Sequence, residues 1–239
     1  MIDLGYPPAC KIDRVVFKKM FNDAGDLSKA DKTLLTDSVD KVTWAYNLRR
    51  DNTMISPYQD DVRKYEEVQV MQVLLRQTKG VRRLAEIIMR AIPYPMMLLF
   101  EHHGRLAVAL AHQRNSLADS TKNTLEDLWI SDFLSSDDEL FTRLRHDRQR
   151  FTHFFDYYSD MVDTLCRALA GYAGAPAEVT GEQARQILHG MASLDGQIAS
   201  LRAELKKETR FNRKMELNIQ IKRLEGKKQR LLTATGGQI

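Results

Sequence analysis

The chain has 239 residues, of which 43% are hydrophobic and 28% are charged, so it has room for one ordinary domain with an appendage or for two small domains. This composition excludes a disordered chain, and the two distant cysteines, Cys10 and Cys166, exclude a disulfide framework and a cysteine zinc site. No apolar run reaches the length of a membrane span and the first residues lack a signal peptide. We therefore expect a cytoplasmic protein without membrane contact.

The charge of the chain is unevenly distributed. The formal net charge is +4, yet residues 202–230 contain eleven Lys or Arg against four Glu. The remainder of the chain is therefore mildly acidic. Such an asymmetry says more about the partners of a protein than about its fold.

The N-terminal region predicts one short strand and one helix. The apolar run 15–17 fits an edge strand or an ordered arm. Ser28 precedes Asp31 by three residues, which is the pattern of a helix N-cap with an acidic residue in the first turn. We expect a helix over about 28–40.

Two strands follow in the sequence. Residues 42–48 alternate apolar and polar side chains around Trp44, which predicts a strand with one face on a core. Residues 67–75 are apolar on both faces except at Gln69 and Gln72, which predicts a central strand with these two side chains on opposite faces.

A helix and a hairpin are predicted next. Apolar residues recur at helical spacing over 81–92, and the helix must end before Pro93 because a residue that precedes proline is driven out of the α region. The apolar runs 96–100 and 106–111 flank Gly104, a residue suited to a tight turn, and predict a β-hairpin.

The remainder of the first domain predicts a strand and a long helix. We expect a strand over 125–130 and a helical region that begins at a cap on Ser135 or Ser136 and continues to about Ala170. One stripe at helical spacing is expected to face the core. It consists of Phe151, Phe154, Phe155 and Tyr158.

The C-terminal region predicts a helical coiled-coil arm. Residues 173–180 are rich in small side chains and contain a proline, which is typical of a linker. Beyond it, apolar residues recur at alternating spacings of three and four, as in a heptad seam. The predicted fold class is α+β, with a mostly antiparallel sheet and packed helices in 1–172, followed by this arm in 181–239. The seam residues are Ile187, Met191, Leu194, Ile198, Leu201 and Leu205, then Leu217, Ile221, Leu224 and Leu231.

The register of this seam breaks around 206–216. The absence of Gly and Pro from 197–225 favours one continuous helix, whereas a helical hairpin with Thr209 or Asn212 in its turn explains the broken register. We favour the hairpin.

No metal, nucleotide or catalytic motif stands out, and no cofactor is expected. His102 and His103 are adjacent, so a strand directs them to opposite faces unless the turn redirects one of them, and with His112 they are interpreted as turn and edge residues. A metal-dependent nuclease would draw its acids from four residues, but no Lys follows either strand acid at the required spacing. The four acids are Asp60, Asp61, Glu67 and Glu101.

Several segments resemble a known family. The sequence is similar to members of the bacterial domain-of-unknown-function 4391 family, which are often labelled as chemotaxis receptors and resemble accessory proteins of restriction-like, anti-phage loci. The resemblance implies no catalytic residues. The segments that carry it are VTWAYNL (42–48), EVQVMQVLL (67–75), AIPYPMMLLF (91–100), TLEDLW (124–129) and KETRFNRKMELNIQIKRL (207–224).

The basic arm predicts contact with another macromolecule. The resemblance implies that the chain is a non-enzymatic accessory subunit of a bacterial defence system, and that the partner on which the arm docks is a helicase or DNA methyltransferase. Two alternatives stay open: a protein that binds nucleic acid through the basic tail, and a divergent metal-dependent nuclease. The seam also leaves open a homo-oligomer. In the first interpretation Phe211 and Leu217 supply apolar anchors and the asparagines fix the register. The predicted site residues are Arg210, Phe211, Asn212, Arg213, Lys214, Glu216, Leu217 and Asn218.

Overall fold

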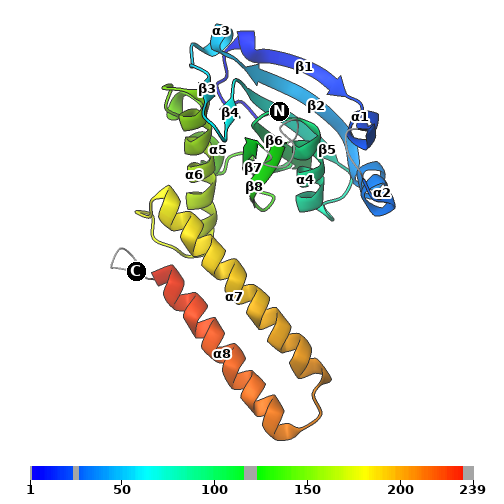
Figure 1. Cartoon of the computed structure of the whole chain (residues 1–239), viewed down its shortest axis with the longest axis vertical. Helices are drawn as coiled ribbons and strands as arrows, with labels where there is room; N and C mark the ends of the chain where they lie inside the picture. The colour runs from blue at the N-terminus through cyan, green and yellow to red at the C-terminus, as the bar shows by residue number, and fades with distance from the viewer. Residues whose placement is uncertain (1, 24–26, 116–122, 234–239) are drawn as a thin grey trace. The chain divides into compact units, whose positions relative to one another are not determined.

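The fold is described from a computed structural model that covers residues 2–23, 27–115 and 123–233 (Figure 1). The chain divides into two compact units, residues 1–165 and 166–239, and each is described by itself. The elements in chain order are η1 (Pro8–Cys10), β1 (Lys11–Val16), α1 (Lys18–Asp23), α2 (Lys29–Ser38), β2 (Val39–Leu48), α3 (Arg50–Thr53), β3 (Tyr58–Gln59), β4 (Lys64–Tyr65), β5 (Val68–Leu75), α4 (Val81–Ala91), β6 (Met96–His102), β7 (Arg105–Asn115), β8 (Asn123–Ile130), α5 (Glu139–Arg143), η2 (His146–Arg148), α6 (Phe154–Tyr172), α7 (Gly181–Lys207) and α8 (Phe211–Thr233).

The first unit is built on a six-stranded sheet with the order β1-β2-β5-β6-β7-β8. All neighbours in it are antiparallel except β5 and β6, which are parallel. Parallel neighbours need a crossover connection, and α4 supplies it. The predicted mostly antiparallel sheet with packed helices is thereby confirmed, and β1 is an edge strand.

The start of α2 follows the predicted capping pattern. The Ser28 hydroxyl accepts a hydrogen bond from the Asp31 backbone N–H at 3.1 Å, and the Asp31 carboxylate accepts one from the Ser28 backbone N–H at 3.2 Å. Arg83 on α4 donates two further hydrogen bonds to the same carboxylate, at 2.8 and 3.0 Å. These bonds from Arg83 are the main cause that lowers the pKa of Asp31 below its usual value. The cap therefore also ties α2 to α4.

Replacing Ser28 by alanine should lower the free energy of unfolding by about 1 kcal/mol, because the backbone N–H of Asp31 loses its acceptor. Urea denaturation of the variant measures the loss. The neighbouring Lys29→Ala change removes an exposed side chain that forms no part of the cap and is the control. An equal effect of the two changes would contradict the role of the cap.

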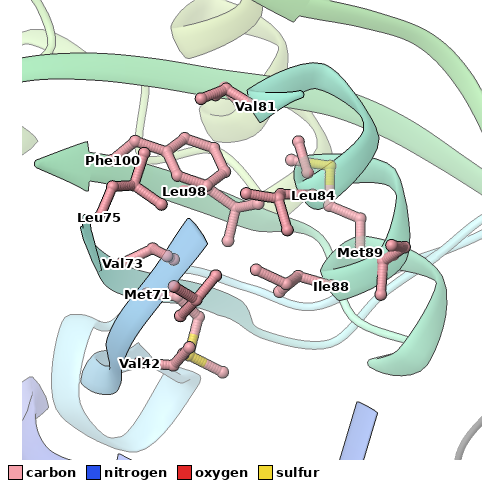
Figure 2. Close-up of a cluster of buried hydrophobic side chains, with 14 of the residues drawn as sticks. Val42, Met71, Val73, Leu75, Val81, Leu84, Ile88, Met89, Leu98 and Phe100 are labelled. Atoms are coloured by element: carbon pink, nitrogen blue, oxygen red, sulfur yellow. The ribbon is translucent and has the colours of Figure 1, made fainter. Parts of the chain in front are cut away.

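One face of the sheet packs against α4 (Figure 2). Alternate residues of each strand point to this face, and α4 presents residues at helical spacing to them. Figure 2 shows part of the cluster of buried hydrophobic side chains in this layer. It includes Val42, Met71, Val73, Leu75, Val81, Leu84, Ile88, Met89, Leu98 and Phe100.

The first turns of α6 contact β6 and β7 through a buried tyrosine. The Tyr158 hydroxyl donates to the carbonyl oxygens of Met96 and Ala111, at 2.7 and 3.0 Å, and its ring lies 5.8 Å from that of Tyr65. Burial raises the pKa of Tyr158 well above its ordinary value, so the hydroxyl stays protonated. A single phenol thus joins α6 to β6 and β7.

The predicted long helix from Ser135 or Ser136 to Ala170 is wrong. Asp138, not a serine, caps the short helix α5, and its carboxylate accepts a hydrogen bond from the Leu140 backbone N–H at 2.9 Å. The chain then leaves the α-helical conformation until α6 begins at Phe154. Phe151 is therefore not part of the core-facing stripe, because it lies in the break between α5 and α6 and its side chain is 48% exposed.

The break contains a buried histidine. His146 shares a hydrogen bond of 2.9 Å with the Tyr157 hydroxyl, and its backbone N–H donates to the Leu4 carbonyl at 2.8 Å. Burial lowers the pKa of His146 below its ordinary value of 6.5. The folded state therefore holds a neutral imidazole under conditions in which the unfolded chain binds a proton.

Protonation of His146 should make the protein less stable in mild acid. The stability that the neutral His146 imidazole contributes is complete above pH 6.5. As the pH drops below 6.5, the free energy of unfolding falls by at most about 1.4 kcal/mol per pH unit, until the pH reaches the folded-state pKa of His146 and the contribution is lost. Thermal unfolding of the wild type and of His146→Gln between pH 5 and 8 measures it. If the pH dependence of the two proteins were identical, another group would be responsible.

The second unit contains α7, α8 and the last part of α6. The unit boundary falls inside α6, and the predicted linker 173–180 lies between α6 and α7. Thr180 caps α7 with its hydroxyl, which accepts a hydrogen bond from the Gln183 backbone N–H at 3.2 Å. The two long helices α7 and α8 pack against each other along their length (Figure 1).

Candidate interaction surface on the C-terminal hairpin

The chain turns back between α7 and α8 at residues 208–210, so the helical hairpin is confirmed over the continuous helix. The Glu208 carboxylate accepts hydrogen bonds from the backbone N–H groups of Thr209 and Arg210, both at 2.8 Å, and from the Arg210 guanidinium. The Arg210 side chain is the main cause that lowers the pKa of Glu208 to about 2. The carboxylate that organises the turn is therefore ionised throughout the physiological range.

Every residue of the predicted apolar seam is buried or half-buried in the structure. Ile187 and Ile198 are buried on α7, and Leu217, Ile221 and Leu232 are buried on α8. Leu217 is 0% exposed, so it offers no surface to a partner while the hairpin is closed. The prediction that Leu217 is an apolar anchor is wrong, because this residue belongs to the internal contact of the hairpin.

Ion pairs connect the two helices. Arg213 donates to Glu204 and to Glu216, both at 2.9 Å, and these two bonds raise the pKa of Arg213. Arg202 pairs with Glu225 at 2.8 Å. Lys228 of α8 adds a further pair, at 2.6 Å, with an aspartate of α7. Arg213 and Glu216, two of the predicted site residues, are thus engaged within the hairpin.

The remaining cations of this segment form no ion pair within the described residues. Four of the eleven Lys and Arg residues in 202–230 form ion pairs, and the other seven have none within the described chain. All four glutamates of the segment are already used in these pairs. The surplus charge is therefore available to another molecule. The seven cations are Lys206, Lys207, Lys214, Lys222, Arg223, Lys227 and Arg230.

A second apolar series lies on the outside of α8. Phe211, Met215 and Ile219 are 74%, 47% and 63% exposed, respectively. They follow one another at intervals of four residues, so they form one ridge on a single face of the helix. We call them the outer ridge. Sequence analysis predicted Phe211 but missed Met215 and Ile219, although their spacing was a readable signal.

The other predicted residues surround the turn. Asn212 and Asn218 are exposed, and neither side chain makes a hydrogen bond within the described part of the chain, so their predicted role in fixing the register has no support. Lys214 is half-buried. A shallow hollow of about 510 Å³ is lined by Arg210, Phe211, Asn212, Arg213 and Glu216.

The two strand acids of the nuclease alternative, Glu67 and Glu101, do not converge. Glu67 accepts hydrogen bonds from Gln69 and Asn47 at 2.6 and 3.3 Å, whereas Glu101 accepts one from Gln72 at 2.6 Å. The register places Glu101 beside residue 74 of β5, roughly 23 Å along the strand from Glu67. These two carboxylates cannot bind one metal ion together.

Asp60 and His102 have structural partners. The Asp60 carboxylate accepts hydrogen bonds from Tyr58 and from the backbone N–H groups of residues 62 and 63, which closes the turn between β3 and β4. The rings of His102 and His103 lie 4.1 Å apart at the hairpin turn, and His102 shares a hydrogen bond with the Leu75 carbonyl. Within the described residues no three His, Cys, Asp or Glu side chains are grouped as a metal site.

Comparison with known proteins identifies a family. Residues 4–227 match the family described as Domain of unknown function (DUF4391). No curated protein and no solved structure shows a significant match to the chain. A search of the described residues for a helix of the length and apolarity that a bilayer requires found none.

Proposed function

The chain belongs to the DUF4391 family, and we propose that it is a non-enzymatic accessory subunit of a bacterial defence system that acts in the cytoplasm. It docks on a larger partner of the helicase or DNA methyltransferase type. The docking element is the helical arm formed by α7 and α8, which we interpret as a short antiparallel coiled coil. The defence context is supported by the resemblance described above.

The observation that carries this proposal is the exposed outer ridge. Burial of apolar surface drives the association of proteins, and a ridge of three large side chains on one helix face costs solubility if nothing covers it. The seam of the hairpin already satisfies the two helices internally, so the ridge is not needed for their pairing. It is best explained as a contact for another protein.

The same surface also distinguishes a protein partner from nucleic acid. The seven cations that form no ion pair within the described residues favour both, because phosphates and acidic side chains each attract them. Phe211, Met215 and Ile219 gain nothing from contact with phosphates, whereas they are typical anchors at a protein interface. The combination of ridge and charge therefore favours a protein.

The test is co-expression of the full chain with the helicase or methyltransferase encoded beside it. We expect the partner to co-purify with the wild type and to be lost with the triple variant Phe211→Gln, Met215→Gln, Ile219→Gln, which we call the ridge variant. Glutamine keeps the helix propensity and removes the apolar surface.

A second triple variant on α7 is the control. It also introduces three glutamines, at exposed positions that share one face of α7 and lie outside the ridge, so it should retain the partner. Its changes are Ala192→Gln, Ala199→Gln and Ala203→Gln. Equal recovery of the partner with both triples would refute docking through the ridge.

Direct binding of nucleic acid is the second candidate, and the seven unpaired cations favour it. It predicts that a DNA duplex binds the full chain with an affinity that falls steeply with salt. It also predicts that Lys222→Glu with Lys227→Glu weakens binding while the ridge variant does not. Absence of binding at low salt would eliminate this candidate.

A further inference from the structure

We infer that the outer face of α8 binds an acidic amphipathic helix of the partner, an inference that rests on the proposed function and specifies the partner's contact element. The outer face consists of the ridge and of three residues that continue its line. Lys222, Gly226 and Arg230 follow Ile219 at intervals of three, four and four residues, so they occupy the same side of the helix. One face of α8 thus begins apolar and ends basic.

The charge of this face selects the partner's chemistry. Lys222 and Arg230 have no ion pair within the described chain, and Arg223 beside them has none either. No acidic residue occupies the line from Phe211 to Arg230. A surface that covers the ridge also covers these cations, and desolvating them without counter-charges is costly. The partner's helix must therefore carry carboxylates next to its apolar residues.

Gly226 indicates that the occupant comes close to the helix. A Cβ atom at this position would have no atom of another element within 4 Å, so the packing of the hairpin does not require glycine. Glycine in a helix interior is unfavourable relative to alanine. The presence of glycine at position 226 is explained if the partner's helix packs closely against α8. The missing side chain leaves a gap between Lys222 and Arg230 that this helix can fill.

The elongated, single-sided shape of the face matches a helix. An apolar groove or ridge presented at intervals of three and four residues is recognised by the corresponding face of an amphipathic helix. Beside α7 and α8, such a helix would complete a three-helix arrangement. The ridge supplies its apolar contacts and the cations flank its acidic side.

A second copy of the chain does not fit this face. If two α8 helices paired in parallel, Lys222 would face Lys222 and Arg230 would face Arg230. If they paired antiparallel, the ridge of each would lie on the cations of the other. Both arrangements bring together cations or cover apolar groups with charge. The face therefore favours an acidic partner over self-association.

The test uses the full chain and two synthetic helices of about 22 residues, close to the length of α8. Both carry leucines at intervals of three and four residues and are stapled to hold the helix. One has glutamates along its flanks and the other has lysines. We expect the glutamate peptide to bind at least about tenfold more tightly in fluorescence anisotropy, and Lys222→Glu with Arg230→Glu to reverse the preference.

The decisive variant is Gly226→Trp. Because the position is open in the free chain, the variant should fold normally and yet lose about tenfold or more in affinity for the glutamate peptide. Gly196→Trp is the matched control, since Gly196 lies on α7 and is equally open. Far-UV circular dichroism of both variants checks their folding.

The outcomes separate the inference from the proposed function. Equal binding of the two peptides, or unchanged binding by Gly226→Trp, overturns the acidic-helix inference even if the natural partner still requires the ridge. Dimerisation of the chain that Gly226→Trp abolishes would assign the face to a second copy and overturn the inference as well. Full retention of the natural partner by the ridge variant overturns the proposed docking itself.

Discussion

Replacing Leu217 by aspartate should open the hairpin. Leu217 is completely buried on α8, and removing a buried leucine side chain costs roughly 2–5 kcal/mol before the penalty of burying a carboxylate is added. A pair of helices has no further layer to compensate this loss. Because isolated helices are only marginally stable in water, we expect α8 to lose most of its helical structure as well.

Hydrogen exchange followed by mass spectrometry measures this effect. In the Leu217→Asp variant, amides of α7 and α8 should exchange much faster, whereas those of the sheet in residues 1–165 should keep their protection. Asn218→Asp introduces the same charge at the exposed neighbouring position and is the control. If both variants exchanged alike, Leu217 would not hold the hairpin together.

Variants that open the hairpin cannot identify the residues that contact a partner. Loss of a partner in a Leu217 variant would follow from the open hairpin and would not place Leu217 in the interface. The same applies to Arg213, whose bonds to two glutamates hold the turn. Phe211, Met215 and Ile219 are better probes, because their side chains are exposed and their removal leaves the seam intact.

The features predicted correctly are those that depend on local chemistry. The cap formed by Ser28 and Asp31 and the helix end before Pro93 each involve only a few neighbouring residues. The hairpin turn at Gly104, which has a φ of 75°, is equally local. Such signals can be read without knowledge of the rest of the fold.

The break between α5 and α6 could not be predicted in the same way. Residues 144–153 contain no Gly or Pro and carry apolar residues at helical spacing. The contacts that hold them out of a helix come from elsewhere in the chain. The His146 N–H donates to Leu4, and the Arg150 guanidinium pairs with Asp160 at 2.7 Å. Tertiary contacts therefore override the local pattern.

The candidate surface was predictable only in part, for a related reason. Helix α8 carries two apolar series, one through Leu217 and Ile221 and one through Phe211, Met215 and Ile219. Both have helical spacing, so the sequence does not tell which series faces α7. The prediction mixed Phe211 with Leu217, and the structure separates them into an outer ridge and an inner seam.

Replacing Gln69 by alanine should destabilise the first unit far more than replacing Gln72, although both are glutamines on β5. Gln69 is 2% exposed and its amide oxygen accepts a hydrogen bond from the Trp44 indole at 2.5 Å. Its amide nitrogen donates to Glu67 and Asn47. The change removes one partner each from the half-buried Trp44 indole, the half-buried Glu67 carboxylate and the buried Asn47 amide, at a cost of about 3 kcal/mol in the free energy of unfolding.

Gln72→Ala is the matched control. Gln72 is half-buried and donates one hydrogen bond, to Glu101, and water can replace that bond, so we expect a loss below about 1 kcal/mol. Urea denaturation of the two variants gives the comparison, and equal losses would mean that the Gln69 network is open to water. A much larger loss of unfolding free energy in Gln69→Ala than in Gln72→Ala would show that the Glu67 carboxylate stabilises the sheet through its hydrogen bonds with Gln69 and Asn47. A carboxylate held in this way serves the fold, and cleavage chemistry is not needed to explain its presence.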